Sequence, residues 1–204
     1  MQSVKRVWCE ALLVADTPTL WPVLPGAPEG LRYIPEFLSE AEHDGLLAHV
    51  ERLPFREVRM HGVVAKRTVI HYGYDYGYDS WQITPADAMP DFQLPFRSRA
   101  AAEAALDPRK LAQVLIARYP AGAGIGWHRD APMFGEPVVG ISLAGLTVMR
   151  FRRGPSRGRE TYPLTLAARS LYILSGPARR EWQHAIAGQK ELRYSITFRT
   201  VKRA

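Results

Sequence analysis

The chain has 204 residues, 47% of them hydrophobic and 23% charged, a balance that favours one folded globular domain and excludes fibrous or disordered classes. Cys9 is the single cysteine, so neither an internal disulfide nor a thiolate metal cluster can form. Any metal site must therefore be built from His, Asp and Glu.

The formal net charge is +7, and basic residues gather in three stretches. These stretches are Arg150 to Arg159, Arg179 to Arg180 and Lys202 to Arg203. Such a surface is typical of a nucleic-acid partner, and equally of a solvated basic face without one.

No stretch approaches the roughly 18 to 20 apolar residues that span a bilayer, and Glu10 interrupts the apolar N-terminal stretch. We therefore expect a cytoplasmic protein without membrane contact. The sequence does not indicate an oligomeric state.

Prolines and glycines crowd residues 1–30 and predict an extended N-terminal arm before a single domain over residues 31–204. A short strand is expected at Leu31 to Ile34. Ser39 and Glu42 then form a capping-box pattern that begins a helix ending near Arg52.

The segment from about 55 to 81 is rich in aromatic residues and alternates in polarity. Gly73 and Gly77 stand among its tyrosines and disfavour a helix, which leaves a hairpin or a lid. An alanine-rich helix is expected around Ser98 to Leu106.

Residues 111–201 change to short runs of β-branched and aromatic residues separated by glycine and proline. This pattern predicts an α+β, mainly β fold: helices packed on a β-sandwich or jelly roll. The expected strands are Val114 to Tyr119, Val138 to Leu143, Thr147 to Arg152, Thr161 to Leu166, Ser170 to Leu174, Trp182 to Ile186 and Arg193 to Val201.

His128 and Asp130 form a His-x-Asp unit, and in an extended chain residues two apart project from the same face. His184, on a later strand, can supply a third ligand. Two imidazoles and one carboxylate leave open positions that suit non-haem Fe(II). With six histidines in the chain, a chance His-x-Asp is the alternative.

The strand Arg193 to Arg199 alternates between an apolar face and a face with both arginines. Inward arginines need a buried anion, and a dicarboxylate such as 2-oxoglutarate would satisfy them. Because about six strand residues span roughly 20 Å, we expect one direct anchor and one supporting arginine. An edge strand with its arginines in water is the alternative.

In order and spacing, residues 31 to 200 resemble the AlkB family of Fe(II)- and 2-oxoglutarate-dependent dioxygenases. The resemblance rests on Tyr119, Gly122, Gly124, Ile125, His128, Asp130, the Leu174-Ser175-Gly176 run, Arg180, Trp182, His184 and the Arg193 to Arg199 strand. It implies a double-stranded β-helix preceded by helices and a nucleotide-recognition lid. It also implies Fe(II) as cofactor and 2-oxoglutarate and dioxygen as cosubstrates.

The resemblance further implies a role for each matching residue. His128, Asp130 and His184 would ligate iron. Tyr119 would bond 2-oxoglutarate, Arg193 its distal carboxylate, and Arg199 would support the metal end. In the lid, Arg67, Tyr72, Gly73 and Tyr78 resemble the family's signature.

Four positions depart from the family pattern. Ala117 and Ser195 replace asparagines near the cosubstrate, and Lys66 replaces the lid proline. Pro132 stands where a repair member has an acidic residue that contacts the methylated base, so this departure bears on the substrate and not on the oxygen chemistry.

The aromatic residues divide into two groups. Trp127 is expected in the core, and Trp182 either in the core or in the pocket. Ordinary packing and the stacking of a flipped base both fit the lid group, which is Tyr72, Tyr76, Tyr78 and Trp81.

Three functions from different classes remain open. An oxidative demethylase of N-alkylated bases in DNA or RNA fits the basic stretches and the aromatic lid. An oxygenase of a protein or small molecule fits Pro132. A catalytically silent jelly roll that binds nucleic acid is the third, and the intact triad argues against it.

Overall fold

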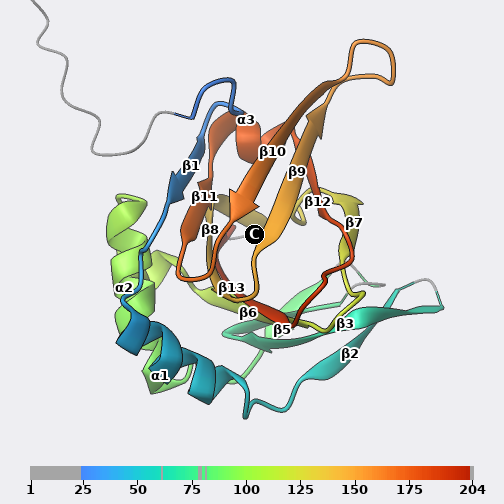
Figure 1. Cartoon of the computed structure of the whole chain (residues 1–204). Coiled ribbons are helices and arrows are strands. Elements are labelled where there is room, and N and C mark those ends of the chain that lie inside the picture. The colour runs from blue at the N-terminus through green and yellow to red at the C-terminus, as the bar shows by residue number, and fades with distance from the viewer. Residues whose placement is uncertain (1–23, 61, 78–79, 81, 203–204) are drawn as a thin grey trace, which may run out of the picture.

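A computed structural model of the chain describes residues 24–60, 62–77, 80 and 82–202 (Figure 1). Two antiparallel sheets face each other and form the expected jelly roll. The larger sheet contains, in spatial order, β1 (Leu31–Ile34), β11 (Leu171–Leu174), β8 (Phe134–Ala144), β13 (Arg193–Val201), β6 (Gln113–Tyr119), β3 (Val63–Tyr72) and β2 (Arg56–Met60). The smaller sheet contains β10 (Glu160–Leu166), β9 (Thr147–Arg153), β12 (Gln183–Ile186) and β7 (Ile125–His128).

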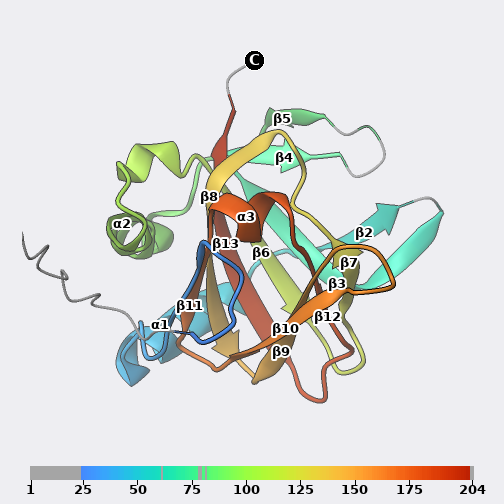
Figure 2. The same cartoon turned by 90° about the horizontal axis from the view of Figure 1, so that it is seen from above.

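Two helices cover the outer face of the larger sheet, α1 (Glu40–Val50) and α2 (Leu94–Glu103) (Figures 1 and 2). The expected capping box begins α1, since Ser39 and Glu42 bond each other's backbone N–H groups. The buried cluster beneath the helices includes Leu46, Ala100, Ile116, Ile141, Tyr194, Ile196 and Phe198. It consists of the apolar side of β13 and its neighbours.

A second buried cluster lies between the two sheets. It includes Val138 from the larger sheet and Met149 and Phe151 from the smaller one. Gly140 permits a close contact here, because a Cβ at this position would lie 2.2 Å from the Tyr172 ring. The Tyr172 side chain therefore crosses the inner face of β8, where it reaches the cavity.

The described parts of the aromatic-rich segment form extended structure, as expected. β2 and β3 pair as a hairpin, and β4 (Tyr74–Tyr76) pairs with β5 (Ile83–Pro85) beside the main body (Figure 2). The turn between β3 and β4 requires Gly73, which has φ of 78° and whose Cβ would collide with a backbone carbonyl. The role of the segment from about 55 to 81 as a nucleotide lid stays a prediction.

Several boundaries differ from those expected. The alanine-rich helix α2 begins four residues earlier than its predicted start, at Leu94, after a short 3-10 turn over Asp91–Gln93. A second 3-10 turn covers Pro108–Lys110, and the short helix α3 (Gly176–Arg180) was not expected. The edge strand β7 was also missing from the expected strands.

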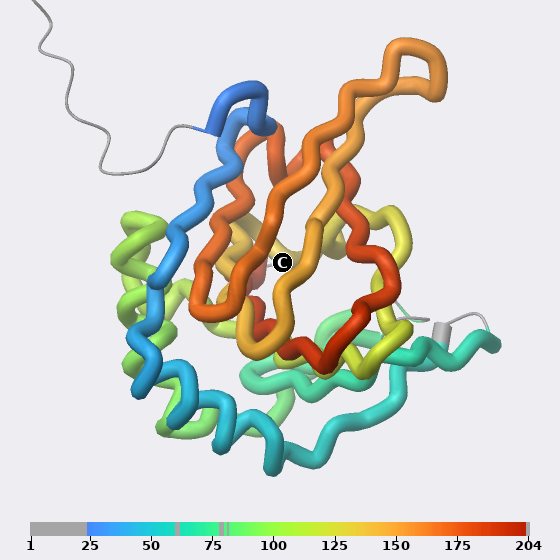
Figure 3. Tube along the Cα trace, in the orientation of Figure 1, coloured from blue at the N-terminus to red at the C-terminus, as the bar shows by residue number. Residues whose placement is uncertain are grey.

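The hairpin of β9 and β10 extends beyond the body of the two sheets, and its tip contains part of the first basic stretch (Figure 3). Most of the predicted N-terminal arm, residues 1–23, lies outside the described residues. Among the residues that the structure describes, every helix is too short or too polar to cross a membrane.

Candidate iron and 2-oxoglutarate site

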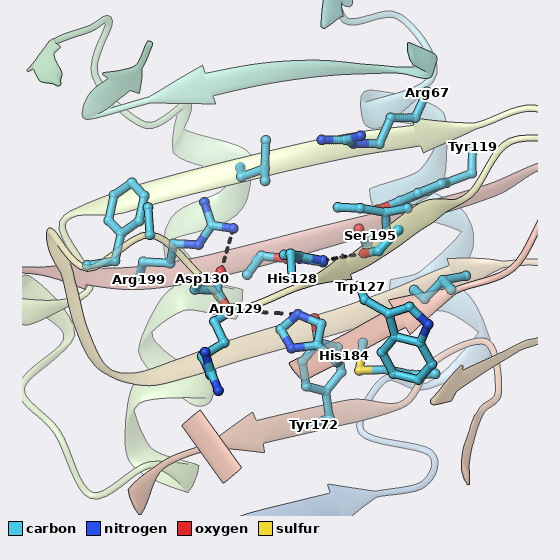
Figure 4. Close-up of a pocket in the computed structure, with 18 of the residues that line it drawn as sticks. Arg67, Tyr119, Trp127, His128, Arg129, Asp130, Tyr172, His184, Ser195 and Arg199 are labelled. Carbon is cyan, nitrogen blue, oxygen red and sulfur yellow. Dashed lines mark hydrogen bonds and ion pairs between the residues drawn. The ribbon is translucent and has the colours of Figure 1, made fainter. Parts of the chain in front are cut away.

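A pocket of about 310 Å³ opens between the two sheets (Figure 4). The inner face of β13 forms one wall, and β7 and β12 form the opposite wall. The residues that line it include Arg67, Tyr76, Tyr119, Trp127, His128, Asp130, Tyr172, His184, Arg193, Ser195, Thr197 and Arg199. The predicted metal and cosubstrate residues therefore all line one pocket.

His128 and His184 lie directly opposite each other on the paired strands β7 and β12. Their ring centroids are 4.3 Å apart. Asp130 lies two residues beyond the end of β7, and its Oδ2 is 3.9 Å from His184 Nε2. Strand pairing thus brings the distant His184 beside the His-x-Asp unit.

Arg199 contacts the Asp130 carboxylate directly, with Nη2 2.8 Å from Oδ1. Burial alone would raise the pKa of Asp130, but the Arg199 guanidinium, followed by His184 and His128, holds it well below its usual range. Asp130 therefore stays an anionic donor, and Arg199 orients it.

Both imidazoles are in the neutral form that metals bind. Burial lowers the pKa of His128, and its Nδ1 lies 2.8 Å from the Gly126 carbonyl oxygen. Burial and the neighbouring His128 lower the pKa of His184 to about 3. If His128 Nδ1 donates to Gly126, the lone pair of His128 Nε2 remains available to a ligand.

The donor set of two neutral imidazoles and one carboxylate fits Fe(II) with open coordination positions. Among the residues that the structure describes, no three His, Cys, Asp or Glu side chains are arranged as a ready-made metal site. The three side chains share the pocket, and side-chain rotation would have to direct all three donor atoms at one ion. Iron ligation by these three side chains therefore stays a prediction.

Arg193 is 1% exposed and lies at the other end of the strand from Arg199. Its Nε and Nη2 donate to the Ser142 hydroxyl at 3.2 and 2.9 Å, and Nη1 has no hydrogen-bond partner. Its guanidinium lies 5.4 Å from the Tyr119 ring centroid. Burial lowers the pKa of Arg193, and within the described part of the chain no carboxylate pairs with it. A small carboxylate ligand would satisfy this buried cation.

Sequence analysis missed two polar residues around Arg193. Ser142 accepts the Arg193 hydrogen bonds from β8, the strand beside β13. Tyr172 lines the pocket, and burial raises the pKa of Tyr172 to about 12. The signal for Ser142 was a buried serine in an otherwise apolar strand run.

The lid residues are divided by the structure. Arg67 and Tyr76 line the pocket, and Tyr76 packs edge-on against Phe134 with centroids 5.9 Å apart. Tyr72 lies in the core under the helices, 8% exposed, so its prediction as a substrate contact is wrong. Tyr78 and Trp81 lie outside the described residues.

The tryptophans also differ from expectation. Trp127 is 38% exposed and lines the pocket, so the prediction of core packing is wrong, because β7 is an edge strand. Trp182 is buried in the cluster between the sheets, which confirms its core alternative.

A sequence model described as the 2OG-Fe(II) oxygenase superfamily matches residues 30–199. The chain therefore belongs to the 2OG-Fe(II) oxygenase superfamily. It is an oxidoreductase of the dioxygenase class, which uses Fe(II) as cofactor and 2-oxoglutarate and dioxygen as cosubstrates. The catalytically silent alternative is thereby set aside.

Within the superfamily, the AlkB resemblance is confirmed by the relatives. An Alkylated DNA repair protein ALKBH8 homolog from Arabidopsis thaliana is 30% identical over 185 residues, covering 79% of this chain and 51% of that protein. A Probable RNA/DNA demethylase ALKBH6 from Danio rerio is 28% identical, covering 79% and 71%. A tRNA (carboxymethyluridine(34)-5-O)-methyltransferase alkbh8 from Xenopus tropicalis is 28% identical, and the match spans 81% of this chain and 26% of that protein.

Solved structures confirm the fold. The structure of OsALKBH1 superposes with a TM-score of 0.67 at 14% identity, covering 84% of this chain and 98% of that chain. A Pseudomonas putida prolyl-4-hydroxylase superposes with a TM-score of 0.60 at 13% identity, covering 85% and 93%. The chain therefore shares its fold both with OsALKBH1 and with a prolyl-4-hydroxylase.

Proposed function

We propose that the chain demethylates N-alkylated bases in nucleic acid by oxidation, with His128, Asp130 and His184 as iron ligands and Arg193 as the 2-oxoglutarate anchor. The observation that supports this most is the buried Arg193 cation, which faces the pocket with an unsatisfied Nη1. It stands on the same inner face as Arg199, which orients Asp130.

Each residue has a distinct task in this proposal. Arg193 and Tyr119 would hold the distal carboxylate of 2-oxoglutarate, and Ser142 would keep the guanidinium in place. Arg199 would keep Asp130 charged and directed at the ion. When bound, Fe(II) with 2-oxoglutarate and dioxygen supplies C–H hydroxylation with release of succinate and CO2. A hydroxylated N-methyl group then leaves as formaldehyde, and the amine is restored.

Nucleic acid is the proposed substrate for two reasons. The relatives are named as a DNA repair protein, an RNA/DNA demethylase and a tRNA methyltransferase. The chain has a net charge of +7, and Arg67, Arg129 and Tyr76 line the pocket. Arginine side chains can neutralise backbone phosphates, and an aromatic ring can stack on a base that has left the base stack.

The test is succinate and formaldehyde release from purified Fe(II) protein with a panel of methylated DNA and RNA oligonucleotides. We expect both products in equal amounts with at least one methylated strand, and neither with its unmethylated copy. Equal succinate release with and without every strand would contradict the nucleic-acid substrate. It would favour the oxygenase of a protein or small molecule, the alternative that Pro132 left open.

A further inference from the structure

The exposed Trp127 at the pocket is paired with an arginine from another strand. The Arg152 guanidinium lies over the Trp127 ring, 4.3 Å from its centroid. Arg152 belongs to β9 and Trp127 to β7, and β12 lies between these strands in the sheet. The pair is therefore assembled by the sheet, on a ring that is 38% exposed.

The orientation of Arg152 is set on two sides. Its Nε donates to Gln183 Oε1 at 2.8 Å, and its plane rests on Trp127. Within the described part of the chain, its Nη1 and Nη2 atoms have no hydrogen-bond partner. A guanidinium that is fixed in this way presents two parallel N–H donors to an anion at little entropic cost.

The next residue, Arg153, differs from Arg152 because its charge is compensated within the chain. Arg153 bonds both Glu160, at 3.0 Å, and Glu181, at 2.6 Å. Two carboxylates thus compensate Arg153, whereas Arg152 has an amide and an aromatic ring as its neighbours. Only Arg152 of these two is available to a phosphate.

The pair lies on the outer face of the smaller sheet, opposite the proposed iron ligands, because successive side chains of a strand point to opposite faces. Trp127 precedes His128, and Gln183 precedes His184. His128 and His184 pair across β7 and β12, and Gln183 pairs with Arg152 across β12 and β9. Trp127 itself also lines the pocket and is labelled in Figure 4. Because β7 is the edge strand of this sheet, a single strand that passes over it can contact the pair while one of its bases lies in the pocket.

We propose that Trp127 and Arg152 form a docking site for the nucleotide that flanks the reacting base in a single-stranded nucleic acid. Arg152 binds its phosphate through Nη1 and Nη2, and the exposed part of the Trp127 ring stacks on its base. The occupant follows from the chemistry, since a phosphate beside a planar base matches a guanidinium fork beside an indole. The inference rests on nucleic acid as the substrate class in the proposed function.

Fluorescence anisotropy of the full chain with a labelled, unmodified strand of about 8 nucleotides tests the docking site. We expect Trp127→Ala and Arg152→Gln each to weaken binding about tenfold. Arg152→Gln should also reduce the slope of log K against log salt by about 0.7, while Trp127→Ala should not. Trp127→Phe should retain most of the affinity.

Arg157→Gln is the matched control, because it removes the same charge from the exposed turn between β9 and β10. We expect it to change the affinity less than twofold. Equal effects of Arg157→Gln and Arg152→Gln would mean diffuse attraction by the basic hairpin and would overturn the docking site. A wild-type chain that does not bind the strand would overturn it as well. Circular dichroism melting verifies that each variant is folded.

The two proposals fail in different ways. If both variants bind like the wild type while methylated strands still yield formaldehyde, the docking site is wrong and the proposed function stands. If both variants lose affinity while no methylated strand yields formaldehyde, the docking site stands and demethylation is wrong. The binding strand contains no methyl group, so its result does not depend on the reaction.

Discussion

The two ends of the pocket use the same residue type in opposite ways. Arg199 and Arg193 lie six residues apart on the inner face of β13, and both are largely buried. Arg199 bonds Asp130, a carboxylate of the chain itself. Among the described residues, Arg193 bonds the neutral hydroxyl of Ser142 and keeps one Nη atom without a hydrogen-bond partner.

This difference separates an internal support from a ligand anchor. An ion pair within the chain has its counter-charge without a ligand, and it fixes the geometry of Asp130. A buried cation without a counterion is costly in the absence of a ligand, and that cost favours binding of an anion. Substitutions at the two ends should therefore affect different ligands.

The largest expected effect is at the metal end. His128→Ala should abolish the weak visible charge-transfer band of the anaerobic Fe(II) and 2-oxoglutarate complex, because two ligands no longer hold the ion. Iron stoichiometry and the visible spectrum are the measurements. His49→Ala is the control, since His49 stacks on Phe92 beside α1, remote from the pocket. A wild-type band in His128→Ala would contradict the triad.

At the carboxylate end, Arg193→Ala should raise the 2-oxoglutarate concentration needed for half-maximal succinate release by about 10- to 150-fold, since a charge-assisted bond is worth about 1.5 to 3 kcal/mol. Iron affinity should be unchanged. Arg193→Lys, which keeps the charge without the fork, should recover part of the loss. Unchanged 2-oxoglutarate dependence would show that another residue is the anchor.

Arg199→Ala should show the opposite division. Loss of the residue that orients a metal ligand lowers metal affinity by about 10- to 100-fold. Titration with Mn(II), monitored by paramagnetic broadening, measures this without turnover. The 2-oxoglutarate dependence at saturating metal should change much less than in Arg193→Ala. Equal effects of both variants on both ligands would remove the distinction between the two ends.

The alternation of β13 and the positions of most strands along the chain were predictable, because period-two patterns and turn residues are local properties. This alternation predicted that Arg193 and Arg199 share one face of the strand, and the family resemblance favoured the pocket over solvent for that face. The bond between Arg199 and Asp130 did not, since it depends on where the chain directs residue 130 after β7 ends. Family resemblance supplied the residues, and the packing of the two sheets against each other supplied the contact.

The errors also have a physical cause. Tyr72 and Tyr76 are only four residues apart, yet one packs under the helices and the other lines the pocket. The chain turns at Gly73 between them, so strand alternation no longer fixes which face a side chain takes. Trp127 was misplaced because β7 was not recognised as an edge strand, where an outward ring meets solvent.

The smallest expected effect concerns the lid and compares recognition of the base with attraction of the backbone. Tyr76 lines the pocket with its ring against Phe134, where it can contact a base. Tyr76→Ala should therefore reduce the preference for a methylated over an unmethylated strand by a few-fold, within the ~1 to 3 kcal/mol of one stacking contact. It should leave the salt dependence unchanged, because no cation is lost. Paired anisotropy titrations of methylated and unmethylated strands at two salt concentrations measure both quantities. An equal loss of affinity for both strands would show that Tyr76 contacts the strand without distinguishing the methylated base.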